Sequence, residues 1–351
     1  MKIPKFLLLL FVTFMISCEM NTVEKNDIKT VLKSWEISKT NYNFDINARD
    51  MFFVDSKIGF VVGYNGEIYK TLNAGKSWTK QISGTTMHLG TVFFLNNNIG
   101  FVAGRAMSEC LDEDCGKGCV VLKTSNGGET WTKKFFKDYT DIYSLIFFNE
   151  NKGVAIIETP NIPNVRNCYI ATTSDGGNTW KFKDLAIYSS TYKIECVDNI
   201  LFIAGDNQKI FKSKDYGDSW QIINTPISVS DNVGNILFYN ENIGFIDGGT
   251  SIYKTSDGGL NWESTNFPFS SLGTFHFYNE TEGFNFKTIF EYDGGDFPKF
   301  KGSIVYQTSN GGKSWNKSEL IDSLYLGLTY FPQKDLGYGI NGSEFYTIKR
   351  K

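Results

Sequence analysis

Proline, arginine and histidine are all scarce in this chain. Its 351 residues include seven prolines, four arginines and two histidines, and the 35 lysines and arginines nearly balance 38 aspartates and glutamates. Nucleic-acid binding calls for a strong basic excess, so this balance argues against such a partner. The two histidines, His88 and His276, are far apart with no motif partner, and we expect neither to be catalytic. Few prolines and many aromatic residues (30 Phe and 18 Tyr) favour β-strands.

Long apolar runs are missing except at the N-terminus, where Phe6–Ile16 is apolar apart from Thr13. Because this run is short for a membrane span and follows two lysines, residues 1–17 are predicted to be a signal peptide. Its end, Met15-Ile16-Ser17-Cys18, resembles the lipobox of bacterial lipoproteins. The resemblance implies acylation of Cys18, a tether over residues 18–30, and anchoring in the bacterial cell envelope on the periplasmic or outer side. The alternative is an ordinary signal peptide with an incidental cysteine.

Tryptophan is rare but recurs at a regular period. The seven tryptophans are Trp35, Trp78, Trp131, Trp180, Trp220, Trp262 and Trp315. Successive spacings of 43, 53, 49, 40, 42 and 53 residues are typical of a repeat protein. The count therefore predicts the number of structural units.

Six of the tryptophans end an octapeptide, [S/T]-x-[D/N]-x-G-x-[S/T/N]-W, such as Thr255–Trp262 (TSDGGLNW). The pattern resembles the Asp-box, or bacterial neuraminidase repeat. Asp or Asn caps its own turn and glycine supplies a positive φ, so each box is predicted to be a structural hairpin turn. Its Asp or Asn residues are Asn73, Asn126, Asp175, Asp215, Asp257 and Asn310. Six similar turns spread around a ring cannot form one active site, so we expect them to be neither catalytic nor metal-binding.

Each box turn joins two strands, and two more strand-like segments lie upstream of them, for example Met51–Val54 and Gly59–Gly63. Each unit thus has four strands, named A to D in chain order, which predicts a β-propeller. Three final segments match strands A to C of a unit without a box: Leu324–Tyr330, Gly337–Ile340 and Glu344–Ile348. Trp35 also lacks a box, so its segment is predicted to supply the missing strand D. The prediction is all-β: a seven-bladed β-propeller of four-stranded antiparallel blades over residues 31–351, closed by an N-terminal strand.

Three units are longer than the others, and the extra residues all fall between strands B and C. The insertions are Arg105–Gly118, Glu158–Asn167 and Lys287–Gly302. In this strand order the B–C loops share one face, opposite the Asp-box turns. Long loops on a rigid scaffold usually carry binding, so we predict that function lies on this face. Tolerated drift in loop length is the alternative.

Two sets of residues on this face are candidates for binding. The arginines are Arg49, Arg105 and Arg166. They could hold a carboxylate, sulfate or phosphate through bidentate hydrogen bonds, or simply be solvated. The aromatic residues of the third insertion are Tyr292, Phe297 and Phe300. These could stack on a sugar, grip a peptide, or form a small core within the loop.

Five cysteines follow Cys18, in a compartment where disulfides persist. The first insertion holds a cluster of three: Cys110, Cys115 and Cys119. A disulfide is predicted to staple this loop, and a metal site with Asp112, Glu113 or Asp114 is the alternative. An odd count leaves at least one thiol unpaired or shared between molecules. Cys196 is expected to be buried on an inner strand.

The segment Gly59–Trp78 follows the pattern G-[FW]-x-x-G-x-x-G-x-I-x-x-T and ends in a box. It resembles the propeller family of photosystem II assembly/stability factors, and the resemblance extends over about residues 31–350. It implies a seven-bladed propeller that binds proteins without catalysis. The arginine-rich binding patch of that family is not evident here, so its specific partner is not carried over.

A glycan-active enzyme is the competing hypothesis, because Asp-boxes also occur in sialidases and xyloglucan-type glycosidases. No sialidase-like arginine motif is found near the N-terminus, but a glycosidase needs only two carboxylates about 5–10 Å apart. The candidate acids are Glu109, Asp112, Asp138, Asp141, Asp231, Asp293 and Asp296. We predict a non-catalytic scaffold that binds a protein, with glycan binding or hydrolysis as the alternative. We expect a monomer without catalytic residues, metal or cofactor.

Overall fold

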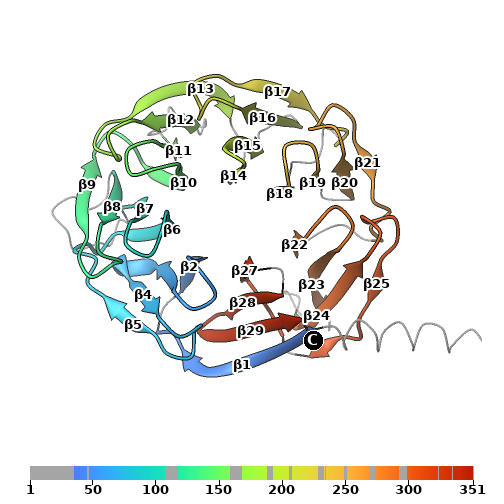
Figure 1. The fold of residues 1–351 in the computed structure, drawn as a ribbon. Coiled ribbons are helices and arrows are strands. Elements are labelled where there is room, and N and C mark those ends of the chain that lie inside the picture. The colour runs from blue at the N-terminus through green and yellow to red at the C-terminus, as the bar shows by residue number, and fades with distance from the viewer. Residues whose placement is uncertain are drawn as a thin grey trace, which may run out of the picture.

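Seven sheets form a closed ring in the computed structural model, and each sheet is one blade of a β-propeller (Figure 1). The structure describes residues 35–45, 47–106, 118–158, 168–187, 193–204, 208–227, 233, 235–248, 251–268, 273–291, 299–322, 324–333 and 335–350. In every blade strand A lies toward the centre of the ring and strand D at its rim (Figure 1). The seven-bladed, all-β prediction is therefore confirmed.

Blades 1 to 3 are four-stranded antiparallel sheets. Blade 1 contains β2 (Ala48–Phe53), β3 (Gly59–Gly63), β4 (Ile68–Thr71) and β5 (Thr79–Gln81), with the 3₁₀ turn η1 (Tyr64–Gly66) between β3 and β4. Blade 2 contains β6 (His88–Phe94), β7 (Gly100–Arg105), β8 (Cys119–Thr124) and β9 (Thr132–Phe136). Blade 3 contains β10 (Asp141–Phe147), β11 (Gly153–Glu158), β12 (Cys168–Thr173) and β13 (Lys181–Ile187).

Blades 4 to 7 repeat this order, with one additional strand in blade 6. Blade 4 contains β14 (Ile194–Val197), β15 (Ile200–Ala204), β16 (Lys209–Ser213) and β17 (Gln221–Asn224). Blade 5 contains β18 (Asn235–Phe238), β19 (Gly244–Asp247), β20 (Ile252–Thr255) and β21 (Glu263–Ser264). Blade 6 contains β22 (Gly273–Phe277), β23 (Gly283–Glu291), β24 (Lys299–Thr308), β25 (Asn316–Lys317) and the short β26 (Ile321–Asp322). Blade 7 contains β27 (Leu328–Gln333), β28 (Leu336–Asn341), β29 (Glu344–Arg350) and β1 (Trp35–Asn43).

The two ends of the described chain meet in blade 7 and close the ring (Figure 1). β1 pairs antiparallel with β29, from Trp35 opposite Arg350 to Asn43 opposite Glu344. The indole of Trp35 stacks on Tyr278 of blade 6, with ring centroids 5.5 Å apart. The N-terminal strand therefore supplies strand D of the last blade, as the tryptophan without a box predicted.

Stacked aromatic rings join five pairs of neighbouring blades. In blade 2 the strand B ring of Phe101 lies flat on Phe147, in strand A of blade 3, with centroids 3.5 Å apart. The equivalent pairs are Phe60 with Phe94, Phe202 with Phe238, Phe245 with Phe277, and Tyr338 with Phe53. The box tryptophan then meets the strand A ring edge-on, as Trp180 meets Phe147 at 6.2 Å. Each buried ring removes about 150–250 Å² from water, so this stack is a main source of stability between blades.

Glycine at the start of strand B is required by the same stack. A Cβ atom on Gly153 would lie 2.7 Å from the ring of Phe147, and one on Gly100 would lie 2.3 Å from Phe94. Contacts this short do not occur in folded proteins, so a side chain there would displace the ring. The glycine–aromatic pair that opens the repeat motif is thus explained by packing.

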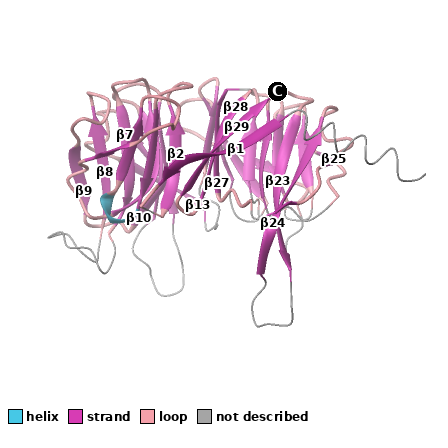
Figure 2. Ribbon diagram, turned by 90° about the horizontal axis from the view of Figure 1, so that it is seen from below, coloured by secondary structure: helices cyan, strands magenta, loops and turns pink. Residues whose placement is uncertain are grey.

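Two details of the predicted strands are wrong. Strand A of blade 7 begins at Leu328 rather than Leu324, because Leu324 and Leu326 are buried in the connection that crosses from blade 6. The third insertion, predicted as a loop, is largely a hairpin, since β23 continues to Glu291 and β24 begins at Lys299. These strands project beyond the rest of the ring on one side (Figure 2).

Candidate functional site

Hydrogen bonds join the Asp-box turns to the A–B turns and define one face of the ring, called the box face below. In blade 1 the amide of Ala74 donates to the carbonyl of Lys57 at 2.9 Å. In blade 2 the amide of Gly127 donates to the carbonyl of Asn98 at 2.7 Å. The B–C connections therefore lie on the opposite face, the loop face, where the β23–β24 hairpin projects (Figure 2).

The polar groups of the box turns are used within the turns themselves. The side-chain oxygen of Asn126 accepts from the amide of Thr130 at 3.0 Å, and Thr124 Oγ1 accepts from the amide of Gly128 at 2.9 Å. The equivalent carboxylate, Asp175, accepts bonds from Thr179 that lower its pKa to about 2. These hydrogen bonds give the box residues a structural role in the turn.

Two of the predicted arginines lie on the loop face beside His88. Arg105 ends β7 and pairs in register with His88, the first residue of β6. The guanidinium of Arg49 lies 5.8 Å from the ring of Tyr64, and that ring is 4.0 Å from the imidazole of His88. Burial, followed by repulsion from Arg49 and Arg105, lowers the pKa of His88 to about 4. His88 is therefore neutral at pH 7.

Two carboxylates of blade 3 complete this group. Arg105 Nη1 is 3.4 Å from Asp141 Oδ2, and Asp141 pairs in register with Glu158 across β10 and β11. Glu158 accepts a hydrogen bond from the hydroxyl of Tyr143. Burial raises the pKa of Asp141 to about 6, although attraction to Arg105 opposes the rise. Arg49, His88, Arg105, Asp141 and Glu158 are called the charged cluster below.

A second polar group lies on or beside the inner strands of blades 1, 4 and 6. Asp50 Oδ2 accepts from the amide of Val92 at 2.8 Å, and burial raises the pKa of Asp50 to about 6. Lys193 forms an ion pair with Glu195 on β14. His276 Nε2 lies 3.1 Å from the hydroxyl of Thr329, and burial lowers its pKa to about 3. His276 thus contacts a hydroxyl group rather than an acid that would orient it as a base.

The projecting hairpin carries a row of exposed aromatic side chains. Phe290 and Phe300 are cross-strand neighbours with ring centroids 6.1 Å apart, and Tyr325 continues the row 5.6 Å from Phe300. Their exposed fractions are 52%, 40% and 39%, respectively. Lys301 and Glu291 form an ion pair at 3.0 Å on the same hairpin. Exposed apolar groups gathered in this way mark interaction surfaces, and these three residues are called the aromatic arm below.

The structure places only part of the predicted site. Residues outside the described part of the chain are Cys18, Cys110, Cys115, Arg166, Tyr292 and Phe297. Cys119 is a buried free thiol. The predicted disulfide of the first insertion otherwise falls on residues outside the described part of the chain. Cys196 lies on an inner strand as expected, but the expectation that it is buried is wrong. β14 ends one residue later in an exposed turn, which leaves the thiol open to water.

Several residues of this face were not singled out from the sequence. They are Tyr64 in the charged region, and Phe290 and Tyr325 on the arm, while His88 was named only as a histidine without a motif partner. Counting back from Phe94 opposite Gly100 would place Leu89 opposite Arg105. The register shift between Leu89 and Thr91 puts His88 there instead, and no sequence signal marks it. Nothing signals Tyr325 either, since its contact with Phe300 depends on β26 pairing with β24.

Across the described residues, no three or more His, Cys, Asp or Glu side chains are grouped so that they could hold an ion. The first insertion, where the sequence suggested a metal site as an alternative, is only described at its two ends.

Comparison with known proteins agrees with this architecture. A family model described as photosynthesis system II assembly factor YCF48 matches residues 165–265. The solved structure of YCF48 bound to a D1 peptide is 16% identical, with 91% of this chain and 97% of that chain covered and a TM-score of 0.62. YCF48 from Cyanidioschyzon merolae is 15% identical, with 90% and 99% covered and a TM-score of 0.63. The chain therefore shares the β-propeller fold of YCF48.

The chain is also similar to part of a glycoside hydrolase. The GH74 enzyme of Niastella koreensis is 14% identical with a TM-score of 0.63, over 89% of this chain but 53% of the enzyme. The propeller therefore corresponds to about half of that protein. A comparison of the sequence with curated proteins gives no significant match. At these identities the solved structures establish only the fold of the chain, and its partner has to be argued from its surface.

Proposed function

We propose that this chain is a non-catalytic, envelope-anchored propeller that binds a protein partner through its loop face. The observation that carries the proposal is the contrast between the faces. Box turns use their own polar groups, whereas the loop face presents the aromatic arm and the charged cluster. Exposed aromatic residues next to paired charges are typical of protein-binding surfaces. A known structure of the same fold, YCF48, holds a D1 peptide, which supports a protein ligand.

The position of β1 supports an orientation for the anchored protein. Trp35 lies opposite Arg350, whose amide donates to the carbonyl of Asp335 in the A–B turn of blade 7. The N-terminal end of β1 therefore lies toward the box face. If Cys18 is acylated, the tether reaches the ring from that side, and the loop face points away from the membrane. No described helix is long and apolar enough to cross a membrane.

Crosslinking in intact cells tests the binding proposal. A lysine-reactive crosslinker should join the wild-type chain to a defined set of envelope proteins, identified by mass spectrometry. Replacing Phe290 and Phe300 together with serine should abolish the main adduct. The control replaces exposed leucines of the box face, Leu72 (64% exposed) and Leu260 (73% exposed), with serine. Equal loss in both variants, or in neither, would refute binding through the loop face.

Lipidation is tested separately from binding. Metabolic labelling with an alkyne fatty acid should label the wild-type protein and not the Cys18→Ser variant. That variant should also leave the membrane fraction, because the acyl chains supply the anchoring energy. Membrane retention of unlabelled Cys18→Ser would show that another device anchors the chain.

One observation favours the glycan alternative. Asp141 is a buried carboxyl with its pKa raised to about 6, and it neighbours the carboxylate of Glu158. A raised carboxyl pKa is the property of a general acid in glycoside hydrolysis. Hydrolysis of a xyloglucan oligosaccharide by the wild type, lost in Asp141→Asn, would establish this function. We expect no hydrolysis, because Arg105 already pairs with Asp141.

A further inference from the structure

Three shallow hollows lie side by side on the loop face over blades 7 and 1. The largest, of about 740 Å³, lies between Ile37 of β1, Leu324 and the Gly342–Ser343 turn. The second, of about 390 Å³, lies between that same turn and Tyr64–Asn65 of blade 1. The third, of about 530 Å³, lies between Asn65–Gly66 and the 81–86 crossing.

Shared residues connect the hollows into one trough. Gly342 and Ser343 border the first and second hollows, and Asn65 borders the second and third. Blades 7 and 1 have short B–C turns, whereas blades 2 and 6 on either side carry the long insertions. The trough therefore follows the low part of the face, and the projecting β23–β24 hairpin stands in blade 6, next to its blade 7 end (Figure 2).

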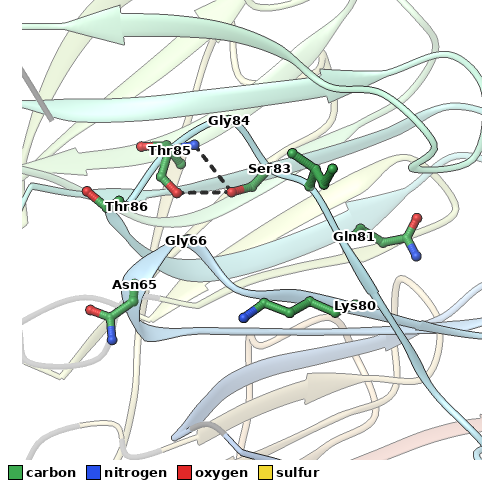
Figure 3. Close-up of a pocket in the computed structure, with 9 residues that line it drawn as sticks. Asn65, Gly66, Lys80, Gln81, Ser83, Gly84, Thr85 and Thr86 are labelled. Carbon is green, nitrogen blue, oxygen red and sulfur yellow. Dashed lines mark hydrogen bonds between the residues drawn. The ribbon is translucent and has the colours of Figure 1, made fainter. Parts of the chain in front are cut away.

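The floor of the third hollow is built tightly from backbone (Figure 3). Ser83 Oγ accepts from the amide of Thr85 at 3.3 Å and donates to its carbonyl at 3.1 Å. Gly66, at φ 70°, approaches so closely that a Cβ there would lie 1.8 Å from the Thr85 carbonyl oxygen. The Asn65–Gly66 turn and the 81–86 crossing thus form a fixed floor. The adjacent side chain of Ile82 is 86% exposed.

Four of the five charged side chains that line the trough pair with each other, and Asp45 of the second hollow is the fifth. Lys39 bonds to Glu344 in the first hollow, and Glu344 also accepts from the hydroxyl of Tyr346. Lys80 pairs with Glu67 at 2.6 Å beside the third hollow. A charged ligand would have to compete with these internal pairs, so the trough favours an uncharged ligand that presents hydrogen-bonding groups.

The aromatic rings of the trough are already covered. Phe44 is 3% exposed and Tyr346 is 8% exposed, and the ring of Tyr64 lies against His88. Sugar binding usually needs an open ring face, whereas alkyl groups at the two ends, the half-buried Ile37 and the exposed Ile82, suit apolar side chains of a peptide. A linear shape, paired charges and alkyl ends favour a polypeptide over a glycan.

We propose that this trough binds an extended, uncharged segment of a partner polypeptide. The segment runs from the aromatic arm, past the paired terminal strands β1 and β29, to blade 2. This inference rests on the proposed protein-binding function and specifies its site and ligand. Since β1 forms one wall of the first hollow, the ligand would bind only to the closed ring.

The test uses the full-length chain in detergent micelles and a phage-displayed random library of linear dodecapeptides. The enriched consensus peptide is synthesised, and its affinity is measured by fluorescence anisotropy. Ser343→Trp fills the trough at an exposed turn and should weaken binding about tenfold or more. Ile82→Ser should weaken it several-fold. The matched control is Ile222→Ser, at a 54% exposed isoleucine of the outer strand in blade 4, which should bind like the wild type.

Each outcome decides between the trough, another site and another ligand. Equal affinity for the wild type, Ser343→Trp and Ile82→Ser would overturn the trough proposal and leave a protein site elsewhere on the loop face. A consensus rich in charges of one sign would also contradict it. If a xyloglucan oligosaccharide binds and Ser343→Trp blocks it, the trough is a glycan site, and the proposed function itself fails. Should Ser343→Trp lose its native circular dichroism, Ile82→Ser against Ile222→Ser decides alone.

Discussion

The box face and the loop face are built by the same repeated unit, yet the partners of their polar side chains differ. On the box face, Thr124 and Asn126 satisfy the turn that contains them, and the same bonds recur in the other boxes. On the loop face, Arg105 reaches across to Asp141 of the next blade, and Phe300 remains 40% exposed. Repetition therefore serves packing, and function is to be sought where the repeat is broken.

Loss of the closing strand should have the largest effect. Deleting residues 35–43 removes the nine-residue strand that pairs with β29 and the stack of Trp35 on Tyr278. We expect a loss of several kcal/mol of unfolding free energy, because blade 7 is left with an open edge. Urea unfolding followed by tryptophan fluorescence measures it. Deleting residues 31–34 is the control, and a shared midpoint would contradict closure by β1.

A ring between blades should cost more than a ring on the arm. Phe101→Ala removes a fully buried side chain stacked on Phe147 and should lower the unfolding free energy by about 3–5 kcal/mol. Phe300→Ala removes an equal volume from the exposed arm and should change stability by less than about 1 kcal/mol. Calorimetry on both variants checks the difference. Similar losses would show that the arm belongs to the core.

A single box turn should contribute less than a ring. Thr124→Val keeps the shape but leaves the buried amide of Gly128 without its acceptor, which should cost about 1–3 kcal/mol. Thr132→Val, on the exposed outer strand β9, is the matched control and should be near neutral. If both variants unfold at the same urea concentration, the hydrogen bonds of the box do not stabilise the turn.

The charged cluster should give stability a pH dependence. The pKa of His88 is lowered from 6.5 to about 4, so between these values the unfolded chain binds a proton that the folded chain does not. Its contribution is full above pH 6.5 and is lost as the pH falls toward 4. Asp141, with a pKa raised to about 6, acts in the opposite direction.

His88→Gln isolates the histidine contribution. As the pH falls from neutral to about 4.5, the unfolding free energy of the wild type should fall by on the order of 1 kcal/mol relative to that of His88→Gln. Urea unfolding at both pH values measures the change. A difference that is independent of pH would show that His88 titrates normally in the folded protein.

Substitutions in the aromatic arm should have the smallest effect on stability and the largest effect on partner binding. Replacing both Phe290 and Phe300 with serine should shift the melting temperature by little, since both rings are exposed. The same variant should lose its crosslinked partner. Unchanged partner recovery in a folded variant would remove the functional distinction between the two faces.

Regular features of the propeller could be read from the sequence, because each depends on contacts within one unit or between identical units. The box turn needs only Thr124, Asn126 and Gly128, which are close in the chain. Closure of the ring by the N-terminal strand was predicted from the one tryptophan without a box, and β1 does pair with β29. The third insertion was predicted as a loop because the extension of β23 to Glu291 depends on cross-strand pairing with Lys299.

The sequence by itself determined the number of blades, their strand order and the way the ring closes, since a strict local pattern repeated along the chain leaves little else to decide. Only the tertiary structure decided what gathers on the loop face. His88, Arg105 and Asp141 come from strands of two blades. The trough combines β1 with turns far away in the chain. Such neighbours arise when the ring closes, because closure fixes contacts that no local pattern records.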